Sequence, residues 1–349
     1  MHTRFESLGA FLPEGRMSTA ELVERMAFKA PFNIEDITGI HNRRVHDKRP
    51  GHFEGSLVLG LAAARDCLKR SRYRAEDLDV IVSVSISRMK DGYELCFEPS
   101  FALELKRLLG ATKAITFDLS NACAGMMSGV MLLDQMIKAG IVKNGIVISG
   151  ECITTIAETA VLEIKEALDP QFGSLTVGDS GAAVVVDEAE DDANKIHHLE
   201  MLTAATGAHF CIGKPSDATP GIALYTDNKQ MHNEDRVRLW PTFQMNLMEK
   251  WGTTFEAEKY DYVVQHQVSV RAIQNFTKFA GKVFNTTMPE ALSICEEYGN
   301  TATTSHFIVL YESLRNKRVK PGSKFLLVPA ASGLVTGFVG VTVSLEIEK

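Results

Sequence analysis

Cys123 is the residue whose type and setting most favour chemistry, because a thiolate is a strong nucleophile. It lies in the stretch Phe117 to Met126, where a strand-like segment ends in a short polar turn among small residues. Apolar residues then recur at helical spacing from Met127 to Ile137. The positive end of a helix dipole stabilises a thiolate, and the free N–H groups of a first helical turn bind an oxyanion. The alternative is an inert cysteine buried in the core.

Two further residues could complete a site of this kind, His266 and Asn300. Each follows an apolar segment that resembles a segment of the first half, at 259–267 and 293–301 respectively. An imidazole supplies a base or a donor to a cysteine nucleophile, and a carboxamide supplies donors to an oxyanion. The alternatives are a core histidine and a turn-forming asparagine.

The elements that must position these residues recur in the same order in the two halves of the chain. Buried strands are expected at 77–85, 144–150 and 178–186 in the first half, and at 259–267 and 321–329 in the second. Helices are expected at 55–71, 100–109 and 240–255, after Cys123 as far as Ala139, and after a capping box from Ser18 to Glu21. Residues 187–196 are expected to be a solvated loop. The recurrence predicts a duplicated α/β protein with halves 1–190 and 191–349, in which corresponding strand ends meet at the centre.

Composition limits the classes of function. The chain has 349 residues, 45% of them hydrophobic and 23% charged, as is usual for a globular protein. A formal net charge of −7 argues against a nucleic-acid-binding face. No stretch has the unbroken apolar length of a membrane span, and no signal-peptide core follows the first residues. Six scattered cysteines without metal-ligand spacing predict reduced thiols, a cytoplasmic location and no metal or cofactor site.

Five short motifs resemble those of thiolase-superfamily condensing enzymes of the ketoacyl synthase III type, in the same order and over nearly the whole chain. They are Thr38-Gly39-Ile40 with Arg43-Arg44, Ala122-Cys123-Ala124-Gly125, Gly178-Asp179-Ser180-Gly181-Ala182-Ala183, His266-Gln267 with Arg271, and Gly299-Asn300-Thr301. Each motif alone is a weak signal, but five in order, each at a strand end, are a strong one. The resemblance implies the thiolase fold, with a duplicated five-layered αβαβα architecture.

The resemblance also implies roles for individual residues. Cys123 would take an acyl group from a thioester, while His266 and Asn300 would bind the carbonyl of the second substrate and stabilise its enolate. The backbone N–H groups of Cys123 and Ser332 would hold the oxyanion of the acyl-transfer intermediates. Candidates for the acyl-binding pocket are Met126, Met127, Phe172, Leu175 and Phe338, although a helical row of methionines more often belongs to the core.

Glu98 is the main departure from the primer-type enzymes of this family, which carry a phenylalanine at that place. The sequence Phe97-Glu98-Pro99-Ser100 is similar to the motif of enzymes that join two acyl chains, namely the olefin-pathway head-to-head, α-pyrone and dialkylresorcinol synthases. In those enzymes the glutamate reaches into the neighbouring subunit and acts as a base. An apolar setting would raise the pKa of such a carboxyl group toward neutrality. The alternatives are an exposed loop glutamate at the helix start, and Glu94 as the base.

The expected function is therefore that of an acyltransferase that forms a carbon–carbon bond by Claisen condensation. It would act as a homodimer in fatty-acid-derived or polyketide metabolism, on acyl thioesters and a second (β-keto)acyl thioester carried on acyl carrier protein. One alternative is a 3-oxoacyl synthase III of fatty-acid initiation that uses a malonyl thioester. Another is acyl transfer to a hydroxyl or an amine without condensation, and a third is a non-catalytic partner subunit, although such subunits commonly lose the cysteine.

Overall fold

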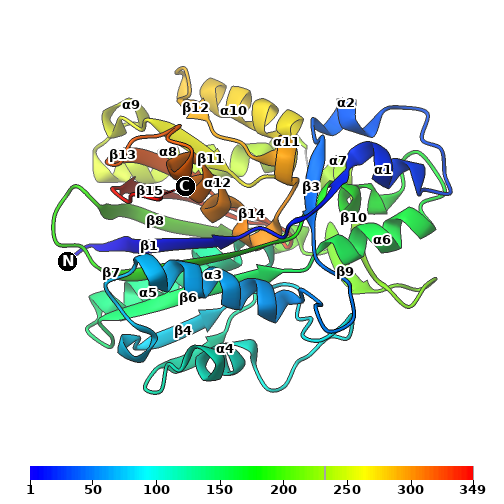
Figure 1. Cartoon of the computed structure of the whole chain (residues 1–349). Coiled ribbons are helices and arrows are strands. Elements are labelled where there is room, and N and C mark those ends of the chain that lie inside the picture. Colours follow the sequence, from blue (N-terminus) through cyan, green and yellow to red (C-terminus); the bar gives the residue numbers. More distant parts are fainter. Residues whose placement is uncertain (232, 349) are drawn as a thin grey trace.

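The structure is a computed structural model that describes residues 1–231 and 233–348. Its frame consists of two β-sheets in which corresponding strands of the two halves of the chain occupy the same positions (Figure 1). The first sheet has the order β1-β7-β6-β4-β5, and its strands are β1 (Thr3–Phe11), β4 (Val80–Ser83), β5 (Ile115–Asp118), β6 (Asn144–Glu151) and β7 (Ser180–Glu188). The second has the order β8-β15-β13-β11-β12, and its strands are β8 (Lys195–Thr203), β11 (Tyr262–Gln265), β12 (Glu290–Ala291), β13 (Ser323–Val328) and β15 (Val335–Val343). The short strand β14 (Ala330–Ala331) also pairs with β15.

The directions of the strands match as well as their order. In each sheet the first two pairings are antiparallel and the last two are parallel. The predicted duplication of an α/β unit is therefore confirmed. The chain changes sheet between Glu188 and Lys195, and this change supports the division into halves at residue 190, which stays a prediction.

Helices fill three layers around the two sheets. The outer faces of the two sheets are covered by α3 (Ser56–Arg70) with α4 (Phe101–Leu109), and by α8 (Glu234–Trp251) with α10 (Val270–Phe284). Between the sheets lie α5 (Gly125–Lys138) and α12 (Ser305–Arg315), whose apolar residues share one cluster with the inner faces of both sheets. This is the expected five-layered αβαβα arrangement of the thiolase fold.

The central strands read as continuous apolar runs because both of their faces are buried. In β4, Val80 and Val82 face the central helices, while Ile81 faces the outer layer. In β13, Phe325 and Leu327 face inward, while Leu326 faces outward. Alternate side chains of a strand point to opposite faces, so one apolar segment serves two layers of the core.

The structure also adjusts several predicted elements. The capping box before α1 (Thr19–Glu24) is confirmed, since Ser18 Oγ accepts from Glu21 N at 3.1 Å and Ser18 N donates to Glu21 Oε2 at 2.7 Å. Helix α8 begins at Glu234 rather than at residue 240, and β7 and β8 take the two ends of the expected loop 187–196. The segment 293–301 holds helix α11 (Cys295–Tyr298) instead of a strand, and the Ser293 hydroxyl accepts from the first N–H of that helix at 3.1 Å.

A lobe of which only α1 was predicted from the sequence lies beside the ends of both sheets (Figure 1, right). Its elements are β2 (Gly15–Ser18), α1, α2 (Ile34–Thr38), β3 (Asn42–Val45), α6 (Thr154–Glu163), β9 (Cys211–Pro215), β10 (Ile222–Thr226) and α7 (Asn228–Met231). Side chains from α1, α2, α6 and β10 pack into one apolar cluster. A short helix, α9 (Phe255–Glu258), precedes β11. No helix of the described residues combines the length and the apolar character needed to cross a membrane.

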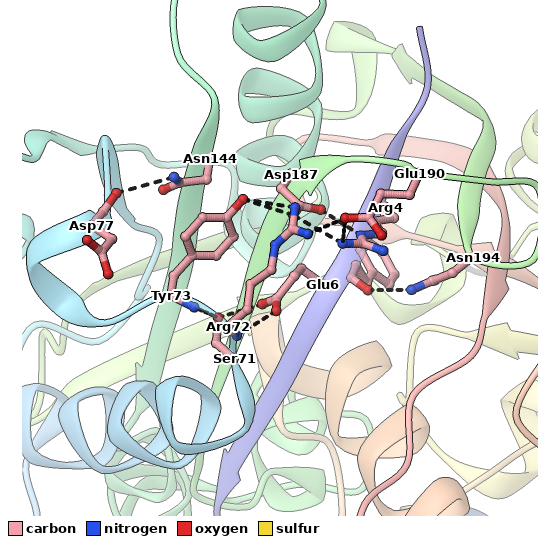
Figure 2. Close-up of polar contacts among 11 residues, drawn as sticks. Arg4, Glu6, Ser71, Arg72, Tyr73, Asp77, Asn144, Asp187, Glu190 and Asn194 are labelled. Carbon is pink, nitrogen blue, oxygen red and sulfur yellow. Dashed lines mark hydrogen bonds and ion pairs between the residues drawn. The ribbon is translucent and has the colours of Figure 1, made fainter.

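A polar network fixes the first strand near the place where the chain passes from one sheet to the other (Figure 2). The Asp187 carboxylate, 1% exposed, accepts from Arg4 Nε at 2.8 Å and from Tyr73 Oη at 3.1 Å. Arg72 also donates to it, at 2.5 Å. The network ties β1, the segment after α3 and the end of β7 together.

We expect Asp187→Ala to lower the free energy of unfolding by about 2–3 kcal/mol, because it leaves Arg4 and Tyr73 without their buried acceptor. The loss stays below that of a fully buried pair because Arg72 is 46% exposed and also pairs with Glu190. Urea denaturation at neutral pH measures the change. A loss below about 0.5 kcal/mol, the range of an ordinary surface substitution, would contradict this role for the network.

Candidate active site

Cys123 lies where β5 gives way to α5, as predicted. A single turn of 3-10 helix, Ala122–Ala124, joins the strand to the long helix. Ala122 has φ +43, a left-handed conformation that costs energy in a residue with a Cβ and persists only where the surroundings enforce it. The turn therefore presents Cys123 at the amino end of a helix that is anchored in the central layer of the core.

The second half of the chain builds the matching turn. Ala302 has φ +53 and begins the 3-10 helix Ala302–Thr304, which leads into α12. By topology Thr303 occupies the place of Cys123, and Asn300 lies just before this turn. The strand ends of the two halves thus meet, as the duplication predicts.

One cavity of about 1420 Å³ receives the predicted polar residues. Its wall includes Cys123, His266, Asn300 and Ser332, which come from both halves of the chain. Most of the remaining wall is apolar, with Phe32, Ile34, Ile156, Phe172, Ile222 and Leu224 among its residues. The structure therefore brings a thiol, an imidazole and a carboxamide to the same apolar chamber.

Burial determines the protonation state of the Cys123 thiol. Removal of the Cys123 thiol from water raises its pKa to about 12, and nearby Cys211 and Glu151 act in the same direction. This effect opposes the thiolate stabilisation that the sequence predicts at a helix start. The thiol is thus neutral near pH 7 in the free protein.

His266 follows β11 and is 6% exposed. Burial, with a smaller effect of His306, lowers the pKa of His266 to about 3, so its imidazole is neutral near pH 7. Its Nδ1 atom is buried without a hydrogen-bond partner within the described part of the chain, and an N–H placed there would be unpaired. Protonation is therefore unfavourable, and His266 supplies a neutral N–H donor rather than a cation.

Asn300 is fixed at both its side chain and its main chain. Its Oδ1 accepts from Ala302 N at 3.0 Å, and its own N–H donates to Thr176 O at 2.8 Å. Because the side-chain oxygen is occupied, the Nδ2 group is the donor that remains for a ligand. Asn300 and His266 thus each offer a neutral donor at the wall of the cavity.

Glu98 is not brought to the cavity of its own chain. It is exposed, in the segment between β4 and α4, and so is Glu94. Its neighbours Leu95 and Phe97 do line the cavity and are 37% and 67% exposed. The base role of Glu98 stays a prediction, and it requires a second subunit.

The predicted pocket residues divide into two groups. Phe172 lines the cavity. Met126 and Met127 lie in the central apolar layer, Phe338 packs against Phe243 of α8 in an outer layer, and Leu175 lies in the apolar cluster of the lobe. These four are at most 1% exposed and are not part of the cavity wall, because the periodicity of each element turns them toward a sheet or a neighbouring helix.

The hairpin β9–β10 supplies wall residues that the sequence reading missed, among them Cys211, Ile222 and Leu224. A signal was present, since Pro220-Gly221 is a turn pair followed by an apolar run from Ile222 to Tyr225.

His46, Cys152 and Asp179 form a separate buried group whose possible ligand atoms lie within 4.8 Å of one another. The Asp179 oxygens already accept from Ile153 N at 2.7 Å, from Thr154 N at 2.7 Å and from His46 Nδ1 at 2.7 Å. This carboxylate therefore secures the start of α6, and its oxygens are occupied by protein donors rather than open to a metal.

We expect the stability of the protein to rise with pH between about pH 4 and 6.5. Burial lowers the pKa of His306 to about 4 from 6.5, so in this window the unfolded chain binds a proton that the folded chain does not. His306→Phe keeps a flat ring but removes this proton. The slope of unfolding free energy against pH should then fall by up to about 1.4 kcal/mol per pH unit. Urea denaturation across the window measures both slopes, and identical slopes would contradict a buried neutral His306.

Comparisons with known proteins agree with this geometry. The family model for "3-Oxoacyl-[acyl-carrier-protein (ACP)] synthase III" matches residues 117–205, and the model for the "C terminal" part of the same family matches residues 252–343. Together the two matches cover just over half of the chain. The chain is 27% identical over 341 residues to a Beta-ketoacyl-[acyl-carrier-protein] synthase III of Pasteurella multocida, covering 97% of this chain and 98% of that protein.

Solved structures share the fold at lower sequence identity. A structure of a Xanthomonas campestris OleA variant with bound lauric acid and lauroyl-CoA superposes on this chain with a TM-score of 0.83 at 22% identity, over 98% of this chain and 99% of that one. The 3-oxoacyl-(acyl carrier protein) synthase III FabH of Pseudomonas aeruginosa PAO1 has a TM-score of 0.80 at 19% identity, over 99% of this chain and 100% of that one.

Proposed function

The chain belongs to the 3-oxoacyl-[acyl-carrier-protein] synthase III family of the thiolase superfamily, and we propose that it is a condensing acyltransferase. It joins an acyl group held on Cys123 to a second acyl or β-ketoacyl thioester carried on acyl carrier protein. The observation that carries the proposal is the convergence of Cys123, His266, Asn300 and Ser332 on one large apolar cavity. No cofactor is needed, because the thioester substrates are already activated.

The first half-reaction loads the enzyme. The Cys123 sulfur attacks the thioester carbonyl and forms a sulfur–carbon bond, and the negative charge of the tetrahedral intermediate falls on the carbonyl oxygen. Backbone N–H groups of Cys123 and Ser332 hold that oxygen. Collapse of the intermediate expels the carrier thiol, which leaves with the proton from Cys123, and an acyl-cysteine remains.

The second half-reaction forms the carbon–carbon bond. His266 and Asn300 donate to the carbonyl oxygen of the second thioester, and a base removes the proton from its α-carbon. The enolate carries its charge on the oxygen between the two donors, which stabilise it most when it is charged. Its α-carbon then attacks the acyl carbonyl on Cys123 and expels the thiolate, which regains a proton.

Glu98 of the partner subunit is the proposed base. Strand β5 is the edge of the first sheet and exposes Ile115 and Phe117, at 47% and 41%. An exposed apolar edge strand is a natural surface for pairing with a second copy of the chain. We propose a homodimer across this edge, which would carry Glu98 to the cavity of the neighbouring subunit.

A second candidate keeps the same site but uses a malonyl thioester, the alternative that the resemblance to ketoacyl synthases III implies. Loss of CO2 then forms the enolate directly, so no carboxylate base is required. The size of the cavity favours two acyl chains, since 1420 Å³ exceeds the roughly 300–1,000 Å³ of ordinary ligand pockets. The OleA structure with bound lauric acid and lauroyl-CoA also supports the condensation of two acyl chains. Acyl transfer to a hydroxyl or an amine is less favoured, because it would leave the donor pair of His266 and Asn300 without a use.

Product analysis tests the proposal. The protein is given lauroyl thioester, on coenzyme A or on acyl carrier protein, either alone or with a malonyl thioester labelled in its free carboxyl group. We expect a β-keto product that contains both lauroyl chains, formed without malonyl thioester and without labelled CO2. A product formed only with malonyl thioester, with release of labelled CO2, would establish the second candidate instead.

A further inference from the structure

Arg43 is a buried cation whose hydrogen-bond partners among the described residues are all neutral. It lies in β3 and is 1% exposed. Its Nη1 donates to Leu175 O and, at 3.4 Å, to Val177 O, while Nη2 donates to Thr19 Oγ1 at 2.7 Å. Burial lowers its pKa to about 10, so it is still charged near pH 7. No carboxylate of the described residues pairs with it. A buried charge without a counter-ion costs folding free energy, which the hydrogen bonds to these neutral oxygens offset in part.

Arg43 donates to the carbonyls of Leu175 and Val177, and Thr176 lies between these two residues. Asn300 N donates to Thr176 O at 2.8 Å, and Gly178 N donates to Asn300 O at 3.0 Å. These bonds make a parallel bridge between Val177 and Asn300. The position of the Asn300 main chain therefore depends on the position of the segment 175–178.

The junction between these two segments leaves no room for adjustment. A Cβ added at Gly178 would lie 2.0 Å from Tyr298 O, and one added at Gly299 would lie 2.5 Å from Thr176 O. Gly299 also has φ +64, which a residue with a Cβ adopts only with strain. Because the two backbones touch, a shift of the segment 175–178 must move Asn300.

The Cys123 side chain packs against the apolar cluster that includes Leu175 and Val177, but its main chain has supports of its own. Cys123 belongs to the turn before α5, whose side chains lie in the central layer between the sheets. Arg43 donates to none of the residues of this turn. A change at Arg43 should therefore act on Asn300 and spare Cys123.

We infer that Arg43 is a positioning residue for Asn300: by binding the carbonyls of Leu175 and Val177, it fixes the backbone that sets the Asn300 amide against the second substrate. The guanidinium fork reaches both carbonyls and Thr19 at once, which a lysine ammonium on its single nitrogen cannot do. This inference rests on the proposed role of Asn300 in the second half-reaction, and it adds a residue outside the cavity to that step.

Arg43→Lys tests the inference, with the two half-reactions measured separately. Acylation of Cys123 is followed by intact mass after brief exposure to lauroyl thioester, and condensation by the rate of product formation. We expect acylation within about twofold of the native rate, and condensation lower by on the order of tenfold to hundredfold, the cost of a small misplacement. In the background of Asn300→Ala, Arg43→Lys should lower condensation little further, because both changes disable the same donor.

Asp187→Ala is the matched control for lost stability, since it weakens the fold far from Asn300 and should lower neither half-reaction selectively. Equal losses of acylation and condensation in Arg43→Lys would overturn the inference, as would a fully additive loss in the double variant. If Arg43→Lys does not fold, Thr19→Val removes one guanidinium contact and should show a smaller loss of condensation alone. Unchanged condensation in Thr19→Val would then overturn the inference.

The same variants test the role of Asn300 and the role of Arg43 separately. If Asn300→Ala condenses normally, the proposed role of Asn300 fails. If Asn300→Ala loses condensation while Arg43→Lys keeps it, only the inference about Arg43 fails.

Discussion

The Cys123→Ala variant is expected to take up no acyl group from a thioester, and all product formation should stop with it. Cys123 is presented by a strained turn at the start of α5 and lines the cavity. Alanine leaves no atom there that can form a thioester. Intact-mass measurement after incubation with lauroyl thioester detects the adduct directly. An acyl adduct of native stoichiometry on this variant would show that another residue is the nucleophile.

Cys211 is the matched control for that experiment. It lines the same cavity from β9, and its thiol accounts for part of the raised pKa of Cys123. Cys211→Ala should still become acylated at Cys123. If the adduct is instead lost in Cys211→Ala and kept in Cys123→Ala, Cys211 is the nucleophile and Cys123 is not. Peptide mapping of the native adduct then locates the acyl group on one of the two cysteines.

The Glu98→Gln variant is expected to load an acyl group normally and to form no condensed product from a second thioester that lacks a carboxyl group to lose. Glutamine keeps the size of the side chain and removes its basicity, so the α-proton has no acceptor. A malonyl thioester makes its own enolate, so product formation from malonyl should survive the substitution. Normal turnover of two lauroyl chains by Glu98→Gln would remove the glutamate from the mechanism.

A mixed dimer shows whether Glu98 acts across the interface. One subunit carries Glu98→Gln and the other Cys123→Ala, and two different affinity tags isolate the dimer that holds one of each. If each cavity uses its own cysteine and the glutamate of its partner, one of the two sites is complete, and about half of the native activity per dimer should return. If Glu98 serves the cysteine of its own chain, no site is complete and the mixed dimer stays inactive.

The parts of the fold that follow from short-range patterns were predictable from the sequence. Cys123 lies at a strand-to-helix junction because small residues and a polar turn separate an apolar strand from a helical repeat. The duplication was visible because strands buried on both faces, such as β4 and β13, read as unbroken apolar runs.

The parts that depend on packing between distant segments were not predictable. Periodicity shows that Met126 and Phe338 are buried, but not whether the space they face is a cavity, a sheet or another helix. The lobe around the cavity assembles from short elements at 15–45, 154–176 and 211–231, none of which carries a strong pattern by itself. Arg43 read as one of a pair of basic residues in a turn, and only the fold shows that it is buried beneath Asn300's partner segment.

The pKa of Cys123 shows the same limit. The sequence places a cysteine at a helix start, which favours the thiolate, but the extent of burial comes from the assembled chamber. Burial is the larger effect, so the resting thiol is neutral.

We propose that one cavity serves both half-reactions with different residues: Cys123 takes part in acyl loading, and the donors His266 and Asn300 take part in condensation. The most direct measurement compares both half-reactions in His266→Ala and Asn300→Ala, by intact mass for loading and by product formation for condensation. We predict loading close to the native rate in each variant, and condensation lower by about a hundredfold or more, the usual cost of one lost donor to a developing oxyanion. Equal loss of loading and condensation in both variants would contradict the division.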